Sequence, residues 1–314
     1  PRTVVIVNHG GVVDLTGVTA PALLDAALLG QAGGSALTDV LFGDVNPSGR
    51  LAETVPLRLQ DTAAYLNFPG EHGHVTYGEG IFVGYRWYDA RELDVCFPFG
   101  HGLSYTTFAY SDLTITPTGS GLRVELTVTN TGHRDGRDVV QVYIGKPDSA
   151  VARPVRELKG FANVEVAQQS SSWVTIEIPH DDLAYWDTRF DRFMVEPGAY
   201  TVSVGASSRA IALTATVELA GDVSRLPLSM NSSIGEVLAD PAAAAAFGPV
   251  FEAMTAGMGG DGTNALGVDL ISIMGSIPVG RLATFSGGAL SPQILQQLLD
   301  EANRAGSVRT VPAG

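Results

Sequence analysis

The stretch Leu122-Arg123-Val124-Glu125-Leu126-Thr127-Val128 alternates between apolar and polar side chains at every position. Because successive side chains of a β-strand point to opposite faces of a sheet, this pattern predicts a strand with one face buried and the other in solvent. Residues 130–132, Asn-Thr-Gly, are a turn signal, and Val140, Val142 and Ile144 then resume the alternation. These residues predict two strands joined by a turn.

Further alternating runs lie C-terminal to this pair, at residues 173–178 and 200–204. Glu196-Pro197-Gly198 separates the two runs and is typical of a turn. Several short strands with turn signals between them indicate an antiparallel β-sandwich. The sequence therefore predicts an all-β sandwich over residues 105–221.

The N-terminal region, residues 1–104, has a different pattern. Residues 3–7, Thr-Val-Val-Ile-Val, predict a strand that is covered on both faces within an α/β sheet. Apolar residues between 23 and 28 fit a helix or a buried strand. Residues 31–42 predict a helix that ends at Gly43. Because the chain opens directly into a strand, we expect its N-terminus to have been made by a cut or truncation inside a domain.

The C-terminal region, residues 222–314, is expected to be helical. Ser233 and Glu236 have the spacing of a capping box, which satisfies two free backbone N–H groups at the start of a helix. A second helix is predicted to begin after Ser291 and to end at Gly306. The Gly-rich residues 257–262 are expected to form a flexible link. The predicted fold class is thus α/β plus all-β: a partial α/β sandwich, an antiparallel β-sandwich and a small helical region.

Composition narrows the classes of partner. The hydrophobic content of 45% with 17% charged residues is typical of a folded globular chain. The formal net charge of -14 makes nucleic acid and anionic membrane surfaces poor partners, whereas neutral sugars and a homo-oligomer stay open. The single cysteine, Cys96, cannot form an internal disulfide, which favours the cytoplasm over secretion.

Three motifs occur in order within the first region: GDVNPSGRL at residues 43–51, YGEGIFVGYRWYD at 77–89 and FPFGHGLSYTTF at 97–108. Together they resemble the α/β sandwich domain that follows the catalytic TIM barrel in family 3 glycoside hydrolases of the β-glucosidase type. Residues 128–132, 139–143, 156–161 and 197–200 look like the fibronectin type III-like domain of these enzymes. Residues 233–241 are similar to a helical appendage of some bacterial members.

The resemblance implies a retaining hydrolase that acts on terminal β-linked sugars in carbohydrate metabolism and uses no cofactor. It also implies that both catalytic residues lie outside this chain, because the family's nucleophile is an Asp of the barrel and its acid/base a Glu that precedes the strand at Thr3. The expected partners are the barrel-bearing remainder of the enzyme and a glycoside or oligosaccharide substrate, and the chain alone is expected to be inactive. The alternative is a non-catalytic carbohydrate-binding or assembly module.

A Gly-rich loop carries the side chains that are candidates for the substrate pocket. It mixes acceptors, donors and an aromatic ring, and loops often carry function. The candidate residues are Glu71, His72, His74, Tyr77 and Glu79. A structural interpretation competes with this one, because Glu79 could pair with Arg86 or cap a turn. His72 and His74 have the two-residue spacing of a pair of metal ligands, but they lack a third ligand, so no metal site is predicted.

The residues that follow this loop are rich in aromatic side chains. They could form a platform on which a sugar stacks, but aromatics at this density more often fill a junction between domains, because each buries a large area. We therefore expect a junction. The residues are Tyr85, Trp87, Tyr88, Phe97, Phe99 and Tyr105.

Overall fold

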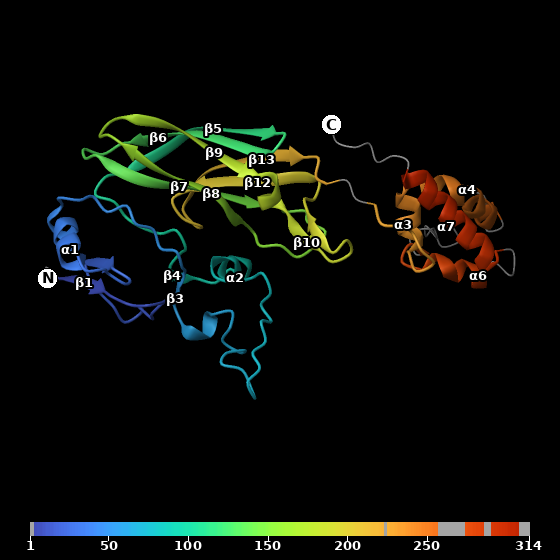
Figure 1. Cartoon of the computed structure of the whole chain (residues 1–314), viewed down its shortest axis with the longest axis horizontal. Helices are drawn as coiled ribbons and strands as arrows, with labels where there is room; N and C mark the ends of the chain where they lie inside the picture. The colour runs from blue at the N-terminus through green and yellow to red at the C-terminus, as the bar shows by residue number, and fades with distance from the viewer. Residues whose placement is uncertain (1–2, 223–224, 257–273, 286–289, 308–314) are drawn as a thin grey trace. The chain divides into compact units, whose positions relative to one another are not determined.

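The computed structural model describes residues 3–222, 225–256, 274–285 and 290–307. The chain forms two compact units, residues 1–187 with 191–222 and residues 188–190 with 223–314. The first unit contains an N-terminal α/β segment and a β-sandwich, and the second is helical (Figure 1).

Two parallel strands open the N-terminal segment. β1 (Val4–Val7) pairs with β2 (Ala22–Asp25), so the apolar run that fitted either a helix or a strand is a strand. The prediction that β1 is covered on both faces is wrong for this chain, because Val4 is 46% and Ile6 is 40% exposed. The physical reason is that the described residues leave the face of the sheet that carries Val4 and Ile6 open to solvent.

The predicted helix and its end are confirmed by α1 (Gly33–Phe42). Gly43 adopts a left-handed conformation with φ of 85°, and its N–H donates to the Val40 carbonyl oxygen at 3.2 Å. Glycine suits this position because it has no Cβ to clash in the left-handed region.

Four short elements complete the N-terminal segment: β3 (Val55–Pro56), η1 (Leu59–Asp61), α2 (Tyr85–Ala90) and β4 (Val95–Phe97). β3 and β4 pair antiparallel, and Val55 lies opposite Phe97. Residues 62–84, here called the arm, connect η1 to α2 without a helix or a strand of their own. Figure 1 shows the arm extending away from the β-sandwich.

The predicted β-sandwich is confirmed, and it consists of two antiparallel sheets. One sheet has the order β5 (Phe108–Thr118), β6 (Gly121–Asn130) and β9 (Ser171–Pro179). The other has the order β13 (Ile211–Leu219), β12 (Gly198–Gly205), β7 (Gly136–Gly145) and β8 (Glu157–Val166). Between β9 and β12 lie η2 (His180–Leu183) and the hairpin of β10 (Tyr185–Asp187) and β11 (Arg192–Met194).

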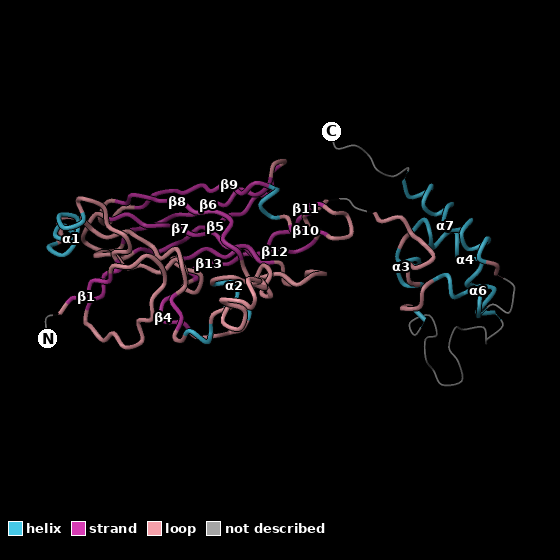
Figure 2. Tube along the Cα trace, turned by 60° about the horizontal axis from the view of Figure 1, so that its bottom comes forward, coloured by secondary structure: helices cyan, strands magenta, loops and turns pink. Residues whose placement is uncertain are grey.

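The core of the sandwich lies between the inner faces of its two sheets, whose strands run alongside one another in Figure 2. The alternation at residues 122–128 determines the inner face of β6: Leu122, Val124, Leu126 and Val128 are fully buried. Val140, Val142 and Ile144 of β7 belong to the same core. The period of two in the sequence thus correctly predicted which side chains the sandwich buries.

The helical unit contains α3 (Ile234–Ala239), α4 (Pro241–Ala256), η3 (Val279–Arg281), α6 (Leu282–Phe285) and α7 (Pro292–Ser307). α7 begins where it was predicted to begin and extends one residue beyond Gly306. Its Leu295 and Leu299 pack in a buried cluster with Phe247 of α4. None of the described helices combines the length and apolar character needed to cross a lipid bilayer. The link predicted at residues 257–262 lies outside the described residues.

The capping box is formed as predicted. The Glu236 N–H donates to Ser233 Oγ at 3.1 Å, and the Ser233 N–H donates to Glu236 Oε2 at 2.7 Å.

We expect Ser233→Ala to lower the free energy of unfolding of the helical unit by about 0.5–2 kcal/mol, because one N-terminal N–H of α3 loses its acceptor. Thermal unfolding followed by circular dichroism at the helix band measures the effect. Ser233→Thr keeps an acceptor oxygen and is the control; equal melting of the alanine and threonine variants would contradict the prediction.

Candidate functional site

The arm carries all five side chains that were predicted to border a substrate pocket. Glu71 and His74 form a backbone bridge in which each N–H donates to the other's carbonyl oxygen at 2.9 Å. His72 and Gly73 form the turn between them, with φ of 51° and 79°. Positive φ at both central residues is typical of the tight turns that join antiparallel segments. The tip of the arm is therefore a small hairpin.

The five candidates differ in exposure. Glu71, His72 and His74 lie exposed at the tip, and Tyr77 is 80% exposed. Glu79 is half-buried, and its Oε2 is a buried atom without a hydrogen-bond partner. In the described part of the chain no side-chain hydrogen bond joins the five to one another, so the arm presents them separately rather than as a closed pocket.

The suggested pairing of Glu79 with Arg86 is wrong. Arg86 Nη1 lies 3.4 Å from Glu157 Oε1, on β8 of the sandwich. Arg86 belongs to α2, which packs toward the sandwich, so its guanidinium reaches a carboxylate far away in the sequence rather than the nearby one in the arm. Arg86 therefore does not neutralise the carboxyl group of Glu79, whose Oε2 has no hydrogen-bond partner among the described residues.

Large apolar side chains of the arm also face solvent. Leu66 is 91%, Phe68 is 74% and Tyr77 is 80% exposed. Exposed apolar side chains of this size can mark a surface that another domain or molecule covers. The arm therefore has the character of a contact surface.

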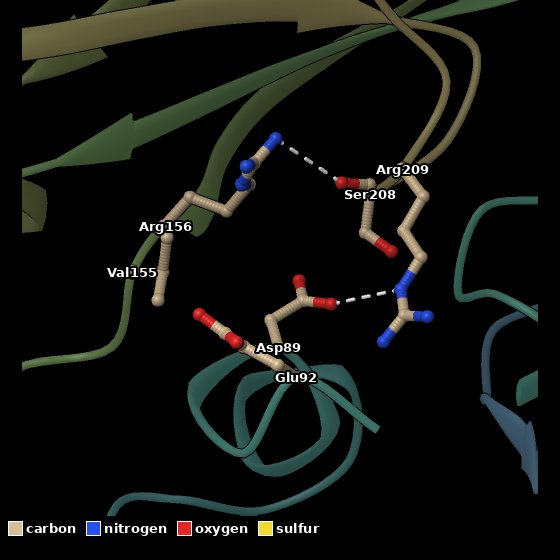
Figure 3. Close-up of a pocket in the computed structure, with 6 residues that line it drawn as sticks. All are labelled: Asp89, Glu92, Val155, Arg156, Ser208 and Arg209. Carbon is tan, nitrogen blue, oxygen red and sulfur yellow. Dashed lines mark hydrogen bonds and ion pairs between the residues drawn. The ribbon is translucent and has the colours of Figure 1, made fainter. Parts of the chain in front are cut away.

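A second polar feature is a hollow of about 380 Å³ where α2 meets two loops of the sandwich. Asp89 Oδ1 accepts a hydrogen bond from Arg209 Nε at 3.0 Å, and Arg156 Nη1 donates to the Ser208 carbonyl oxygen at 3.3 Å (Figure 3). The lining residues are Asp89, Glu92, Val155, Arg156, Ser208 and Arg209. Sequence reasoning did not single out this site, because its residues come from three separate segments with no local spacing in common.

Two of the six aromatic residues predicted to form a junction, Tyr85 and Phe99, do form one with the sandwich. Trp87 and Phe97 instead contact Asp61 and His101 of the N-terminal segment. The Tyr85 ring stacks on Phe99 with centroids 4.7 Å apart and meets Tyr143 of β7 edge-on at 6.0 Å. The Tyr85 hydroxyl accepts a hydrogen bond from the Leu158 N–H at 2.7 Å. Burial raises the pKa of both tyrosine hydroxyls, so they act as neutral hydrogen-bonding groups. The rings of Tyr85 and Phe99 are occupied by packing, so these two are not a sugar platform.

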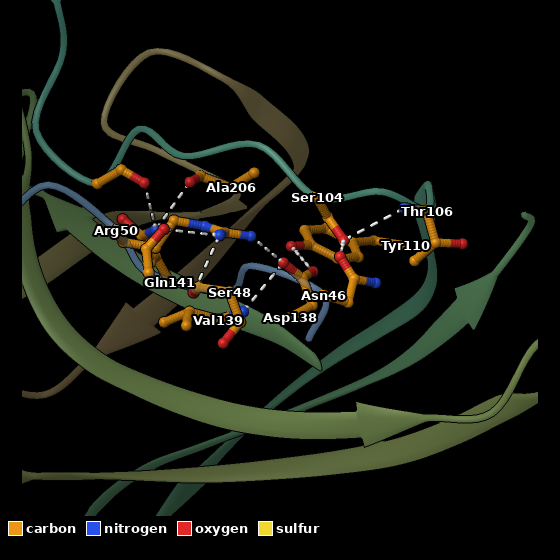
Figure 4. A network of polar contacts seen from close by, with 12 residues as sticks. Asn46, Ser48, Arg50, Ser104, Thr106, Tyr110, Asp138, Val139, Gln141 and Ala206 are labelled. Carbon is orange, nitrogen blue, oxygen red and sulfur yellow. Dashed lines mark hydrogen bonds and ion pairs between the residues drawn. The ribbon is translucent and has the colours of Figure 1, made fainter. Parts of the chain in front are cut away.

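A network of polar contacts joins the same two parts (Figure 4). Arg50 Nη2 lies 2.7 Å from Asp138 Oδ1, and Asp138 Oδ2 accepts from the Tyr110 hydroxyl at 2.5 Å. Nearby, Asn46 Nδ2 donates to the Asp135 carbonyl oxygen at 2.9 Å. Asn46 and Arg50 come from the N-terminal segment, whereas Tyr110, Asp135 and Asp138 come from the sandwich, so these side chains fix the segment to the sandwich.

Comparisons with known proteins decide the family. Residues 1–105 match the model of the glycosyl hydrolase family 3 C-terminal domain, and residues 138–208 match a fibronectin type III-like domain. The chain belongs to glycosyl hydrolase family 3. It corresponds to the C-terminal part of such enzymes, as the resemblance implied.

Similar proteins cover nearly all of this family 3 chain. Thermostable β-glucosidase B of Acetivibrio thermocellus is 40% identical over 96% of the chain, which covers 40% of that protein. An exo-α-(1→6)-L-arabinopyranosidase of Bifidobacterium breve is 42% identical over 96% of the chain, which again covers 40% of that protein. The crystal structure of a GH3 β-glucosidase from Bifidobacterium adolescentis matches 77% of this chain, with a TM-score of 0.73 and 46% identity. The match covers 36% of the chain in that crystal structure. The chain thus spans about 40% of the length of the curated relatives.

The motifs that indicated the family have a structural role in this chain. Residues 43–51 contribute Asn46 and Arg50 to the polar network, and residues 97–108 contribute Phe99 to the aromatic junction. Residues 77–89 contribute Tyr85 to that junction and Asp89 to the hollow. These residues of the family pattern therefore hold two domains together.

Proposed function

We propose that this chain is the C-terminal portion of a retaining glycoside hydrolase that releases a terminal β-linked sugar, glucose or a related one, from a glycoside. The observation that supports this proposal most directly is the membership of the chain in family 3. The chain also aligns with about 40% of the length of each of two relatives, which are named β-glucosidase and arabinopyranosidase. The remainder of the protein, the barrel-bearing part, would hold the sugar and supply the chemistry.

Retaining hydrolysis needs two carboxyl groups about 5 Å apart on either side of one glycosidic bond, one as nucleophile and one as acid/base. The carboxyl groups of this chain that are held by defined contacts support structure instead: Asp138 pairs with Arg50, and Asp89 pairs with Arg209. We therefore assign the nucleophile and the acid/base to the remainder, and to this chain the support of that site.

Two surfaces of the chain suit contact with the barrel-bearing part. One is the sheet of β1 and β2, where Val4 and Ile6 are exposed and both sheet edges are open to further strands among the described residues. The other is the arm, with its exposed Leu66 and Phe68. Covering these side chains would bury apolar area at about 25 cal/mol per Å². This gives a physical reason for the two parts to associate.

The arm is the part of this chain that we place beside the substrate. Its tip combines carboxylate, imidazole and phenol groups at Glu71, His72, His74 and Tyr77, which are free to donate to and accept from sugar hydroxyls. Glu79 adds a carboxyl oxygen that is buried without a partner. An unpaired buried acceptor is costly, and a substrate or a group of the barrel-bearing part would supply its hydrogen bond.

Hydrolysis of a nitrophenyl β-glucoside tests this function. The purified 314-residue chain is expected to release no nitrophenol above the rate in buffer, whereas its mixture with the barrel-bearing polypeptide is expected to release it continuously. The barrel-bearing polypeptide alone is the control, and it is expected to be far less active than the mixture. Hydrolysis by the 314-residue chain on its own, or a mixture without activity on any β-glycoside, would overturn the proposal.

A further inference from the structure

Two polar atoms in the wall of the hollow beside α2 have no partner within the part of the chain that the structure describes. Ser208 is 1% exposed and its Oγ makes no hydrogen bond, and the Asp89 side chain is 10% exposed with an unpaired Oδ2. Buried polar groups nearly always have a partner, and an unpaired one costs about 1–3 kcal/mol. The hollow thus contains unused hydrogen-bonding capacity of two kinds, a hydroxyl and a carboxylate oxygen.

The surroundings of these atoms determine which ligand chemistry fits. Figure 3 shows Asp89 pointing between Arg156 and Arg209, with Ser208 Oγ on the side of Arg209. Two carboxylates and two guanidinium groups line the hollow, so their formal charges cancel. An ionic ligand would have to compete with the existing contact of Asp89 with Arg209. A neutral ligand that both donates and accepts hydrogen bonds can add to these groups without separating them.

We propose that this hollow binds a neutral polyhydroxyl ligand of monosaccharide size. A volume of about 380 Å³ lies at the lower end of the range for small-molecule sites, about 300–1,000 Å³. Ligand hydroxyls donate to Asp89 Oδ2 and exchange a hydrogen bond with Ser208 Oγ, while Arg156 offers N–H groups beyond the one that contacts the Ser208 carbonyl oxygen. Val155, which is 54% exposed, supplies an apolar edge for the C–H face of a sugar ring. The site does not depend on hydrolysis, because every group in it belongs to this chain.

Titration of the 314-residue chain with D-glucose, followed by ligand-observed saturation-transfer NMR, tests the site. Saturable binding is expected. Val155→Trp places a large ring in the hollow and is expected to weaken binding at least tenfold, and Ser208→Ala about five- to tenfold because one hydrogen bond is lost. Val151→Trp is the matched control: it makes the same change at an exposed position that does not line the hollow, and it is expected to leave binding unchanged.

Two results would overturn this assignment. One is glucose binding that is absent, or equal in the chain and in its Val155→Trp variant. The other is displacement of glucose by glycine or inorganic phosphate at equal concentration, which would indicate a site for ions. Crystals of the whole protein soaked in glucose give an independent measurement: density for a sugar ring in contact with Asp89 and Ser208 supports the assignment, and water alone in the hollow contradicts it.

Discussion

Replacing Arg50 with methionine is expected to lower the free energy of unfolding of the first unit by about 3–5 kcal/mol. The change keeps most of the volume of the side chain but removes the charge that lies 2.7 Å from Asp138 Oδ1. Asp138 is 2% exposed, so its carboxylate would stay buried with only hydrogen bonds from the Tyr110 hydroxyl and the Val139 N–H. Breaking one side of a buried ion pair is much more costly than the pair itself is stabilising, because the remaining charge cannot return to water.

Urea unfolding of the 314-residue chain, followed by near-ultraviolet circular dichroism, measures this effect as a change in the midpoint. Arg137→Met is the matched control. Arg137 lies on the same strand as Asp138, and its ion pair with Glu165 is half-exposed on one side and largely exposed on the other. Exposed pairs contribute about 0–1 kcal/mol, so this variant is expected to unfold almost like the parent. Equal effects of the two substitutions would show that burial of the Arg50 pair has no consequence.

Local patterns predicted the elements whose stability is determined locally. The alternation at Leu122 to Val128 identified the buried face of β6, and the spacing of Ser233 and Glu236 identified the start of α3. In both cases the decisive contacts follow from strand or helix geometry, so the spacing of residues in the sequence is enough to predict them. The same holds for the end of α1 at Gly43.

Contacts between distant segments could not be predicted in this way. Pairing of Arg86 with Glu79, seven positions away, was one of the alternatives, but the partner of Arg86 is Glu157, 71 positions along the chain. The exposure of β1 could not be predicted from its sequence either. An apolar run indicates that burial of the strand is favourable, but it does not identify the element that covers it. For the candidate site, the sequence identified the arm residues, but the hollow formed by Asp89, Arg156 and Ser208 depends on how three separate segments meet.

The resemblance of the motifs to a family predicted membership correctly but did not reveal what the motif residues do in this chain. Asn46 and Arg50 are polar side chains in a turn segment, and such residues could equally contact a substrate. The structure assigns them to Asp135 and Asp138 of the sandwich instead. Gly100 of the third motif has a comparable role, because it permits the close approach of Gln141 from the sandwich.

Gly100→Ala is expected to destabilise the first unit by about 3 kcal/mol, from two effects that act together. Gly100 has φ of 82°, a conformation that costs a residue with a Cβ about 1–2 kcal/mol. An added Cβ would also overlap the Gln141 side-chain amide, lying 2.8 Å from Cδ, 2.9 Å from Nε2 and closer still to Oε1. Gln141 cannot move away without loss, because its Nε2 donates to two carbonyl oxygens and its Oε1 accepts from the Tyr143 hydroxyl.

The same urea unfolding experiment separates the two effects. Gly49→Ala is the control, because an added Cβ there meets no atom within 4 Å and the backbone needs no positive φ; it is expected to change stability by less than about 1 kcal/mol. In the background of Gln141→Ala the overlapping amide is absent, so Gly100→Ala should cost only the conformational part, about 1–2 kcal/mol. A Gly100→Ala cost that is the same with and without the Gln141 amide would show that overlap with this amide does not contribute to the cost, and it would contradict the prediction. A smaller cost in the Gln141→Ala background would instead show that the glycine is required because the sandwich places a buried amide where a side chain would otherwise lie.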